Sequence, residues 1–183
     1  MSKIQVIDNF LPQEIFEQFA YQIISSRCYR MLPYTTNPIE ATNNNFTEIQ
    51  AQALLYARNT DGIQSSDIYE INYPAIQALK ESLKIKKLWL MRSICIIGQN
   101  KSYQGVYHTD FPKTNITNPK IAILYLNSNN GGTHFKDEVF VKSEANRCVI
   151  ADGYKEHAGV WQTDEKLRFV LNINYEEHEK ESN

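Results

Sequence analysis

The chain has 183 residues, of which 42% are hydrophobic and 22% charged, with a formal net charge of −2 and a pI near 6.1. This length and composition predict a single globular domain over residues 1–183. The slightly acidic balance gives no case for broad binding to a nucleic-acid backbone, which requires a basic surface. No apolar run is long enough for a signal peptide or a membrane span. Three widely spaced cysteines form no CxxC pair, which favours reduced thiols in a cytoplasmic protein.

The first 87 residues are expected to provide helical support and polar loops. Residues 4–7 have the character of a short strand, and Pro12 fits the first turn of a helix that follows. One apolar face at helical spacing runs through this helix: Ile15, Phe16, Phe19, Ala20, Ile23 and Ile24. A second helix is predicted over residues 73–85, with Pro74 near its start.

Between these helices, residues 28–66 are polar and rich in Asn and Thr. This composition predicts loops, with a short helix over residues 48–59. A long polar insertion in a compact domain often forms a lid or a binding loop, so substrate-binding loops are expected within residues 34–66.

From residue 88 onward the sequence changes to short runs that are rich in β-branched and aromatic residues and are separated by turn residues. The runs are KLWLMRSICIIG, IAILYLN, GGTHF, EVFVK, RCVIAD and LRFVLNINY. Short strands at this spacing predict a sandwich or jelly roll over residues 88–175 and disfavour a parallel α/β sheet. The expected fold is therefore mainly β with supporting N-terminal helices, and residues 176–183 form a charged tail.

The stretch GVYHTDFP places His108 and Asp110 two residues apart in a chain with only four histidines. In a strand, residues i and i+2 share a face, so both side chains would be available to one metal ion. An isolated His-x-Asp is more often a histidine hydrogen-bonded to a nearby carboxylate, because metal ligation needs further partners.

His157, in ADGYKEHAGVWQ, follows a tight turn at Asp152–Gly153 and lies beside a strand-like run. A double-stranded β-helix brings residues near its second and seventh core strands together, which makes His157 the candidate third ligand. Two histidines and one carboxylate form the facial triad of non-haem Fe(II) oxygenases, which leaves three coordination positions open. Taken alone, His157 would more often be a surface or capping histidine.

Arg168 opens the last strand-like run, in which strict alternation separates two unlike faces. The apolar face carries Phe169, Leu171, Ile173 and Tyr175. The face of Arg168 carries Val170, Asn172 and Asn174, a polar set that is unusual in a core strand unless it lines a pocket. A half-buried guanidinium needs a partner, and a planar carboxylate matches it best. That carboxylate would belong either to a ligand or to an acidic residue elsewhere.

His108-x-Asp110, His157 and Arg168, in this order, resemble the motifs of the 2-oxoglutarate/Fe(II)-dependent dioxygenase family, and the prolyl-4-hydroxylase-like branch is the most similar. The likeness extends to VIDNFLPQEIFEQF, ICIIGQNKSYQGVYHTDF, AILYLNSNNGGTHF, NRCVIADGYKEHAGV and LRFVLNINY. It covers residues 4–25 and 88–175. The resemblance implies a double-stranded β-helix, or jelly roll, as the fold.

The resemblance also implies roles for five residues. His108, Asp110 and His157 would ligate Fe(II), and Arg168 would bind the distal carboxylate of 2-oxoglutarate. Tyr125 stands where the family often places a phenol that hydrogen-bonds the same carboxylate. With Fe(II), 2-oxoglutarate and O2, the enzyme would hydroxylate a C–H bond and release succinate and CO2. Its substrate would be a prolyl or other peptidyl residue, or a small molecule. Collagen-type prolyl hydroxylases carry Lys where Arg168 stands, so the chain is more similar to bacterial, viral and oxygen-sensor members.

Two other functions remain open at this point. One is a cupin-like module without oxygenase chemistry that binds a metal or ligand through His108 and His157, although a cupin would cluster more histidines in one strand. The other is an inactive relative that serves as an interaction domain, which would have no physical reason to keep the triad and Arg168 together. Trp89 and Trp161 are expected to pack the core, and His134 is expected to face away from Thr133.

Overall fold

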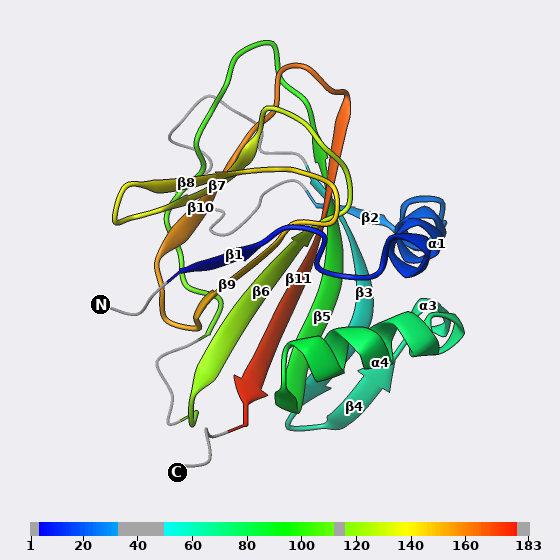
Figure 1. The fold of residues 1–183 in the computed structure, drawn as a ribbon. Helices are drawn as coiled ribbons and strands as arrows, with labels where there is room; N and C mark the ends of the chain where they lie inside the picture. The colour runs from blue at the N-terminus through cyan, green and yellow to red at the C-terminus, as the bar shows by residue number, and fades with distance from the viewer. Residues whose placement is uncertain (1–3, 33–49, 112–115, 179–183) are drawn as a thin grey trace.

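The computed structural model describes residues 4–32, 50–111 and 116–178, which form a helical layer, a large sheet and a small sheet (Figure 1). The large sheet contains β1 (Gln5–Ile7), β2 (Arg30–Leu32), β3 (Gln50–Asn59), β4 (Gly62–Ser65), β5 (Ile85–Ile97), β6 (Pro119–Tyr125), β9 (Cys148–Asp152) and β11 (Leu167–Glu177). The small sheet contains β7 (Gly132–Phe135), β8 (Val139–Lys142) and β10 (His157–Val160). The helices are α1 (Gln13–Ile24), α3 (Asp67–Ile71) and α4 (Tyr73–Ser82).

The large sheet has the strand order β1-β9-β6-β11-β5-β3-β2, with β4 paired to β3, and the small sheet has the order β10-β7-β8. The strand pairings of both sheets are antiparallel. The last strand, β11, therefore lies in the middle of the large sheet between β5 and β6. The predicted mainly β fold with supporting helices is confirmed.

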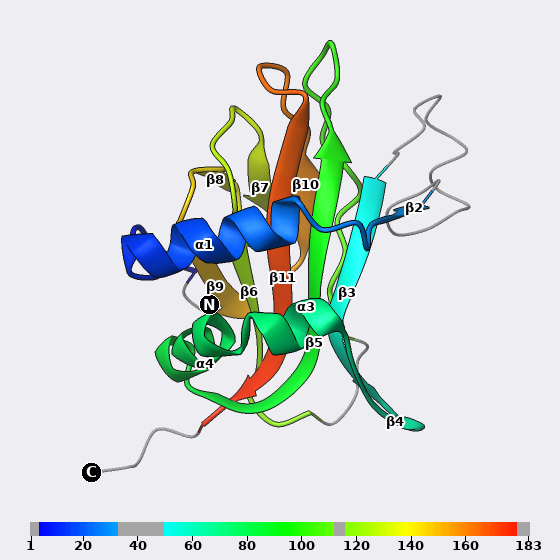
Figure 2. The same cartoon turned by 90° about the vertical axis from the view of Figure 1, so that its right-hand side faces the viewer.

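The helices cover one face of the large sheet, and the small sheet lies on the other side (Figure 2). The helix α1 begins after Pro12 and buries Phe16, Phe19, Ala20 and Ile23. The helix α4 buries Ala75, Ile76 and Leu79 in the same hydrophobic cluster. The predicted helix after Pro12 is present, and the helix predicted over residues 73–85 forms over Tyr73–Ser82, because Ile85 already belongs to β5. None of the helices among the described residues is long and apolar enough to cross a membrane.

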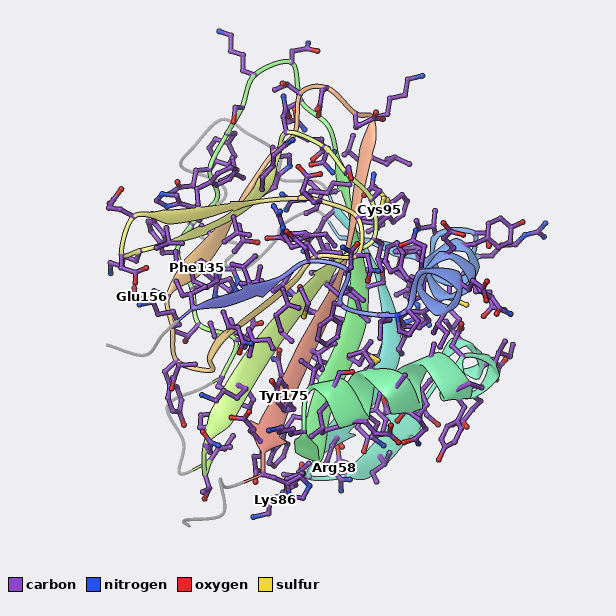
Figure 3. All side chains as sticks on the ribbon, in the orientation of Figure 1. Arg58, Lys86, Cys95, Phe135, Glu156 and Tyr175 are labelled. Carbon is purple, nitrogen blue, oxygen red and sulfur yellow. The ribbon has the colours of Figure 1, made fainter. Side chains whose placement is uncertain are left out.

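The alternation predicted for the last strand is confirmed in β11. Phe169, Leu171, Ile173 and Tyr175 belong to the cluster beneath the helices, whereas Val170 belongs to a second cluster between the two sheets. Figure 3 marks Tyr175 close to α4, and it marks Phe135 on the small sheet. Because successive strand residues point to opposite faces, one strand serves both cores and presents Arg168 to the space between the sheets.

The helix predicted over residues 48–59 is wrong, because residues 50–59 form the strand β3. This strand pairs with β5 on one side and with β2 and β4 on the other. Its Ala and Leu residues have good helix propensity, but burial against neighbouring strands overrides that weak preference. The strands β2 and β4 also lie in the segment for which loops were predicted. Residues 33–49 lie outside the described residues.

Candidate metal centre and anion pocket

Three candidate ligands from two segments meet at one point of the structure. Their ligand atoms, one each from His108, Asp110 and His157, all lie within 4.8 Å of one another. The two histidines form an isolated antiparallel bridge, in which each backbone N–H donates to the other carbonyl at 3.0 Å. His108 and Asp110 thus lie in an extended segment and a bend after β5, not in the regular strand that the sequence suggested.

Backbone carbonyls fix the orientation of both imidazole rings. His108 Nδ1 lies 3.1 Å from the Val106 carbonyl, and His157 Nδ1 lies 3.0 Å from the Lys155 carbonyl. A carbonyl oxygen can only accept a hydrogen bond, so the proton of each neutral ring belongs on Nδ1. Each Nε2 then keeps its lone pair, which is the arrangement that a metal-ligating histidine requires.

The surroundings of the cluster favour a neutral His108 and leave one Asp110 oxygen available to a cation. Burial lowers the pKa of His108, and the neighbouring His157 lowers it further, so the neutral form is favoured. The Asp110 side chain is only 3% exposed, and its Oδ2 has no hydrogen-bond partner among the described residues. A buried carboxylate oxygen without a partner is costly unless a cation compensates it. Two imidazole nitrogens and one carboxylate therefore fit a facial Fe(II) site better than a cysteine-rich structural zinc site.

A cavity of about 80 Å³ lies beside the two histidines, between the large and small sheets. Its described lining comprises Gln50, Arg92, Ile94, Ile96, Gly105, Val106, His108, Ile123, Thr133, His157, Gly159, Trp161, Arg168, Val170 and Asn172. Seven of these fifteen described residues are polar or charged, and none of them is Asp or Glu. Such a pocket can hold and orient a small anionic ligand next to a metal ion.

Arg168 is 2% exposed and lies on the cavity wall. Its Nη1 donates to the Gly132 carbonyl at 2.7 Å and to the Val160 carbonyl at 2.6 Å, whereas its Nε has no partner within the described part of the chain. Burial lowers the pKa of Arg168 to about 10, because no described carboxylate compensates its charge. The position of Gly159 keeps the space beside it open, since a Cβ atom there would lie 3.3 Å from Nη2. Of the two partners considered from the sequence, a ligand carboxylate suits this site.

Tyr125 lies behind the cavity wall and does not belong to its lining. Its hydroxyl is 2.9 Å from Thr133 Oγ1 and 3.2 Å from the Val141 carbonyl. Burial raises the pKa of Tyr125 to about 12. Thr133 is the member of this group that lines the cavity, so Tyr125 reaches the pocket through the Thr133 hydroxyl.

Several other residues that were considered from the sequence lie at or near the cavity. Asn172 lines the cavity, whereas Asn174 on the same face does not. His134 faces away from the cavity and bonds the Tyr107 hydroxyl at 2.6 Å. Trp161 is buried and lines the cavity, in addition to packing. Arg92 was not predicted, although its spacing from Ile94 and Ile96 along one strand face was a signal that could have found it.

No protein-family model matches the sequence, and no curated protein sequence matches it significantly. The fold, in contrast, matches many solved structures. A Pseudomonas putida prolyl-4-hydroxylase matches with a TM-score of 0.62 at 13% identity, over 97% of this chain and 94% of that chain. A Trichoplax adhaerens prolyl hydroxylase, solved with a hypoxia inducible factor peptide, matches with a TM-score of 0.62 at 14% identity, over 95% and 83% of the chains.

A third structure is the non-haem α-ketoglutarate-dependent epimerase SnoN from nogalamycin biosynthesis. It matches with a TM-score of 0.61 at 14% identity, over 96% of this chain and 78% of that chain. The same enzyme has also been solved with Fe3+, α-ketoglutarate and nogalamycin RO. At these identities the likeness shows the fold, and the jelly roll predicted from the sequence is confirmed.

Proposed function

We propose that the chain is an Fe(II)- and 2-oxoglutarate-dependent dioxygenase that hydroxylates a C–H bond and releases succinate and CO2. The observation that carries this proposal is that two buried charged groups lack partners, one in the three-residue cluster and one on the wall of the cavity beside it. Among the residues that the structure describes, Asp110 Oδ2 and Arg168 Nε are buried and have no hydrogen-bond partner. A cation and a carboxylate ligand would satisfy both groups. The similar fold of enzymes that use iron and α-ketoglutarate supports the same assignment.

The proposed roles follow from the contacts of each side chain. His108 and His157, through Nε2, and Asp110, through a carboxylate oxygen, would hold Fe(II). Arg168 would bind the distal carboxylate of 2-oxoglutarate, and Tyr125 would orient Thr133 beside it. When bound, the iron with 2-oxoglutarate and O2 supplies the oxidising chemistry. The chain's own tasks are to hold the ligands in place, to exclude water and to position the substrate.

The proposed substrate is a prolyl or other peptidyl residue, or a small molecule with a comparable C–H bond. Two enzymes of similar fold are prolyl hydroxylases, and one of them was solved with a peptide, which supports a peptidyl substrate. The epimerase of similar fold shows that the same scaffold also serves a small-molecule reaction. We further propose that residues 1–183 act as one dioxygenase domain. A cytoplasmic location is proposed because the described cysteines are free thiols.

Anaerobic titration with Fe(II) and then 2-oxoglutarate tests this function. We expect a weak visible charge-transfer band when the keto acid chelates the iron. His157→Ala should lose metal binding and the band. Arg168→Ala should keep the metal and weaken 2-oxoglutarate binding at least tenfold, because it removes a charge-assisted contact of about 1.5–3 kcal/mol. Metal binding without the band in the unmodified protein would contradict the proposal and favour a cupin-like binding module.

A further inference from the structure

Besides the cavity that holds Arg168, the structure has a second hollow next to the metal centre. Both hollows lie on the face of the large sheet that is turned away from the helices. We call the second hollow the outer groove, and its volume is about 550 Å³. It is lined by Cys28, Arg30, Gln52, Leu54, Gln64, Ser66, Leu90 and Arg92. Arg92 also lines the cavity that holds Arg168, so one side chain borders both spaces.

The strand register explains why Arg92 borders both spaces. Arg92 on β5 lies opposite Asn172 of β11 and Leu54 of β3. One row further along, Ile94 lies opposite Gln52, which in turn lies opposite Arg30 of β2. Directly paired residues of neighbouring strands point to the same face of a sheet. The side chains of Arg30 and Arg92 therefore belong to the face that also presents Arg168.

Apart from Asp110 at the metal centre, the described charged side chains around the two spaces are arginines. Arg30, Arg92 and Arg168 line the two spaces, and no Asp or Glu occurs among the described lining residues of either. This is notable in a chain whose formal net charge is −2. A concave surface lined by one charge sign attracts ligands of the opposite sign. Gln52, Gln64 and Ser66 add hydrogen-bonding groups to the wall of the outer groove.

Arg92 is poorly satisfied by its surroundings. Its Nε is buried and has no hydrogen-bond partner among the described residues. Its Nη2 lies 4.0 Å from Asp110 Oδ1, which is the outer limit of an ion pair. Asp110 is the proposed ligand of a dication, and a carboxylate that coordinates a metal has less charge to offer a second cation. A further anion in the outer groove would give the guanidinium a planar partner.

We expect this anion to differ from the distal carboxylate of the cosubstrate that Arg168 is proposed to bind. Arg168 lies opposite Ile96, four residues along β5 from Arg92. At a rise of about 3.3 Å per residue, the two rows are roughly 13 Å apart along the strand. The metal centre lies next to both spaces, since His108 lines the cavity that holds Arg168, and Asp110 lies beside Arg92, which lines both.

We propose that the substrate to be oxidised carries a carboxylate or phosphate group, which Arg92 and Arg30 bind in the outer groove while the reactive carbon is directed to the metal centre. This inference rests on the proposed function and deepens it. A peptide would fulfil it with an acidic residue beside the target, and a small molecule would fulfil it with its own oxyanion. A wholly neutral substrate would leave Arg92 with a buried, unpaired nitrogen.

The test uses the full chain with Zn(II) in place of Fe(II) and with saturating 2-oxoglutarate, so that Arg168 is already occupied. Three probes are titrated separately by calorimetry: N-acetyl-aspartate amide, its neutral analogue N-acetyl-asparagine amide, and inorganic phosphate. We expect the unmodified protein to bind one anionic probe and to bind the neutral analogue at least tenfold more weakly. The preferred anion distinguishes a carboxylate substrate from a phosphate substrate.

Variants then locate the binding. Arg92→Gln should weaken binding of the anionic probe at least tenfold, and Arg30→Gln should weaken it severalfold. The matched control is Arg58→Gln, because Arg58 lies on β3 and bonds Tyr56 and Leu88, outside both spaces; this change should leave probe affinity unaltered. Thermal melts confirm that each variant folds.

The outcomes separate this inference from the proposed function. Unaltered Zn(II) and 2-oxoglutarate affinities in Arg92→Gln, with the anionic probe lost, support the inference. A tenfold loss of 2-oxoglutarate affinity in Arg92→Gln would overturn it and assign Arg92 to the cosubstrate. Equal binding of charged and neutral probes, or of neither probe, to protein that still binds Zn(II) and 2-oxoglutarate would overturn it as well. Failure of the unmodified protein to bind Zn(II) and 2-oxoglutarate would instead contradict the proposed function.

Discussion

At the scale of single residues, the site consists of groups whose hydrogen-bonding capacity is only partly used. The Nδ1 atoms of His108 and His157 are bonded to carbonyls, and Asp110 Oδ2 and Arg168 Nε have no described partner. His108, Asp110, His157 and Arg168 could be selected from the sequence because the four occur in a specific order and spacing, although each alone has a more ordinary interpretation. Arg92 was missed although it shares a strand face with Ile94 and Ile96, because only the fold shows that this face borders two hollows.

The variant Tyr125→Phe tests whether the Tyr125 hydroxyl only supports Thr133 or contacts the proposed cosubstrate directly. Removing the hydroxyl leaves Thr133 and the Val141 carbonyl without this partner, so the free energy of unfolding should fall by about 1–2 kcal/mol. Because Tyr125 reaches the cavity through Thr133, 2-oxoglutarate affinity should fall less than threefold. Urea unfolding and anaerobic titration measure the two effects. An affinity loss as large as that of Arg168→Ala would instead show that the phenol itself contacts the ligand.

At the scale of elements, β11 could be predicted and β3 could not, for a physical reason. The two faces of β11 differ sharply in polarity, so a period of two is visible in the sequence. In β3 the residues on both faces are mostly Ala, Leu and Gln, which suit helices equally well, and only the neighbouring strands decide the conformation. The missed strands β2, β3 and β4 supply four of the eight described lining residues of the outer groove, so the segment in which substrate-binding loops were expected borders this groove as strands.

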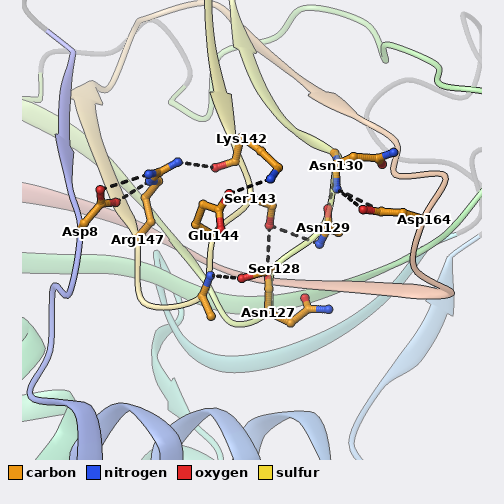
Figure 4. A network of polar contacts seen from close by, with 12 residues as sticks. Asp8, Asn127, Ser128, Asn129, Asn130, Lys142, Ser143, Glu144, Arg147 and Asp164 are labelled. Carbon is orange, nitrogen blue, oxygen red and sulfur yellow. Dashed lines mark hydrogen bonds and ion pairs between the residues drawn. The ribbon is translucent and has the colours of Figure 1, made fainter.

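The connections between strands are tied together by polar side chains at one end of the sandwich (Figure 4). Arg147 pairs with Asp8, Lys142 with Glu144, and Asn130 with Asp164. The Ser128 hydroxyl accepts from the Ala145 N–H, and Ser143 donates to the Asn127 carbonyl. These contacts join the connections β6–β7, β8–β9 and β10–β11 and thereby fix the small sheet relative to the large one.

Asn146, in the β8–β9 connection, anchors the chain that leads into α1. Its side chain accepts from the Leu11 N–H at 3.0 Å and donates to the Leu11 carbonyl at 2.8 Å. Asn146→Ala should lower the free energy of unfolding by about 2–4 kcal/mol, because two buried backbone groups lose their partners. Lys84→Ala is the control, since Lys84 also has a positive φ but is exposed, and it should change stability little. Urea unfolding compares the two, and equal effects would contradict the anchoring role.

At the scale of the whole molecule, the hydrophobic cluster between the helices and the large sheet buries two of the three thiols. Cys148 is fully buried and Cys95 nearly so, whereas Cys28 is exposed. Burial raises the pKa of Cys95 to about 11 and also raises that of Cys148.

Alkylation of the native protein by iodoacetamide at neutral pH should therefore modify Cys28 alone, because the thiolate is the nucleophile. Mass spectrometry should show one adduct before denaturation and three afterwards. Cys28→Ser should remove the single native adduct. Rapid modification of Cys148 in the native protein would show that the core beneath the helices opens readily.

Exposed ion pairs predict how the molecule responds to acid. Hydrogen bonds from Arg147, Lys155 and Lys142 lower the pKa of Asp8, Asp137 and Glu144, respectively. A lowered pKa means that the folded state holds the charged carboxylate more tightly than the unfolded state does. The resulting stability is present above the ordinary values of 3.8 and 4.5 and is lost as the pH falls through the folded-state values.

Combined replacement of the three carboxylates by Asn, Asn and Gln should flatten the loss of melting temperature below about pH 4.5, and the effect should be small because these pairs are exposed. Melting curves measured between neutral and acidic pH, at low and high salt, test this. If the melting temperature of the triple variant fell with pH as steeply as that of the unmodified protein, the acid sensitivity would arise from other groups.

The central position of β11 has a consequence for how sequence length can vary in this protein. Inserting one residue early in β11 would exchange the two faces of the strand from that point on, so that asparagines would enter the core under the helices and leucine and tyrosine would enter the cavity. The same insertion at Asn100–Ser102, where the chain is exposed and belongs to no strand, would shift no side chain between faces. Natural or engineered variants of this chain should therefore differ in length in the segment that leads to His108, while the spacing within β11 stays constant.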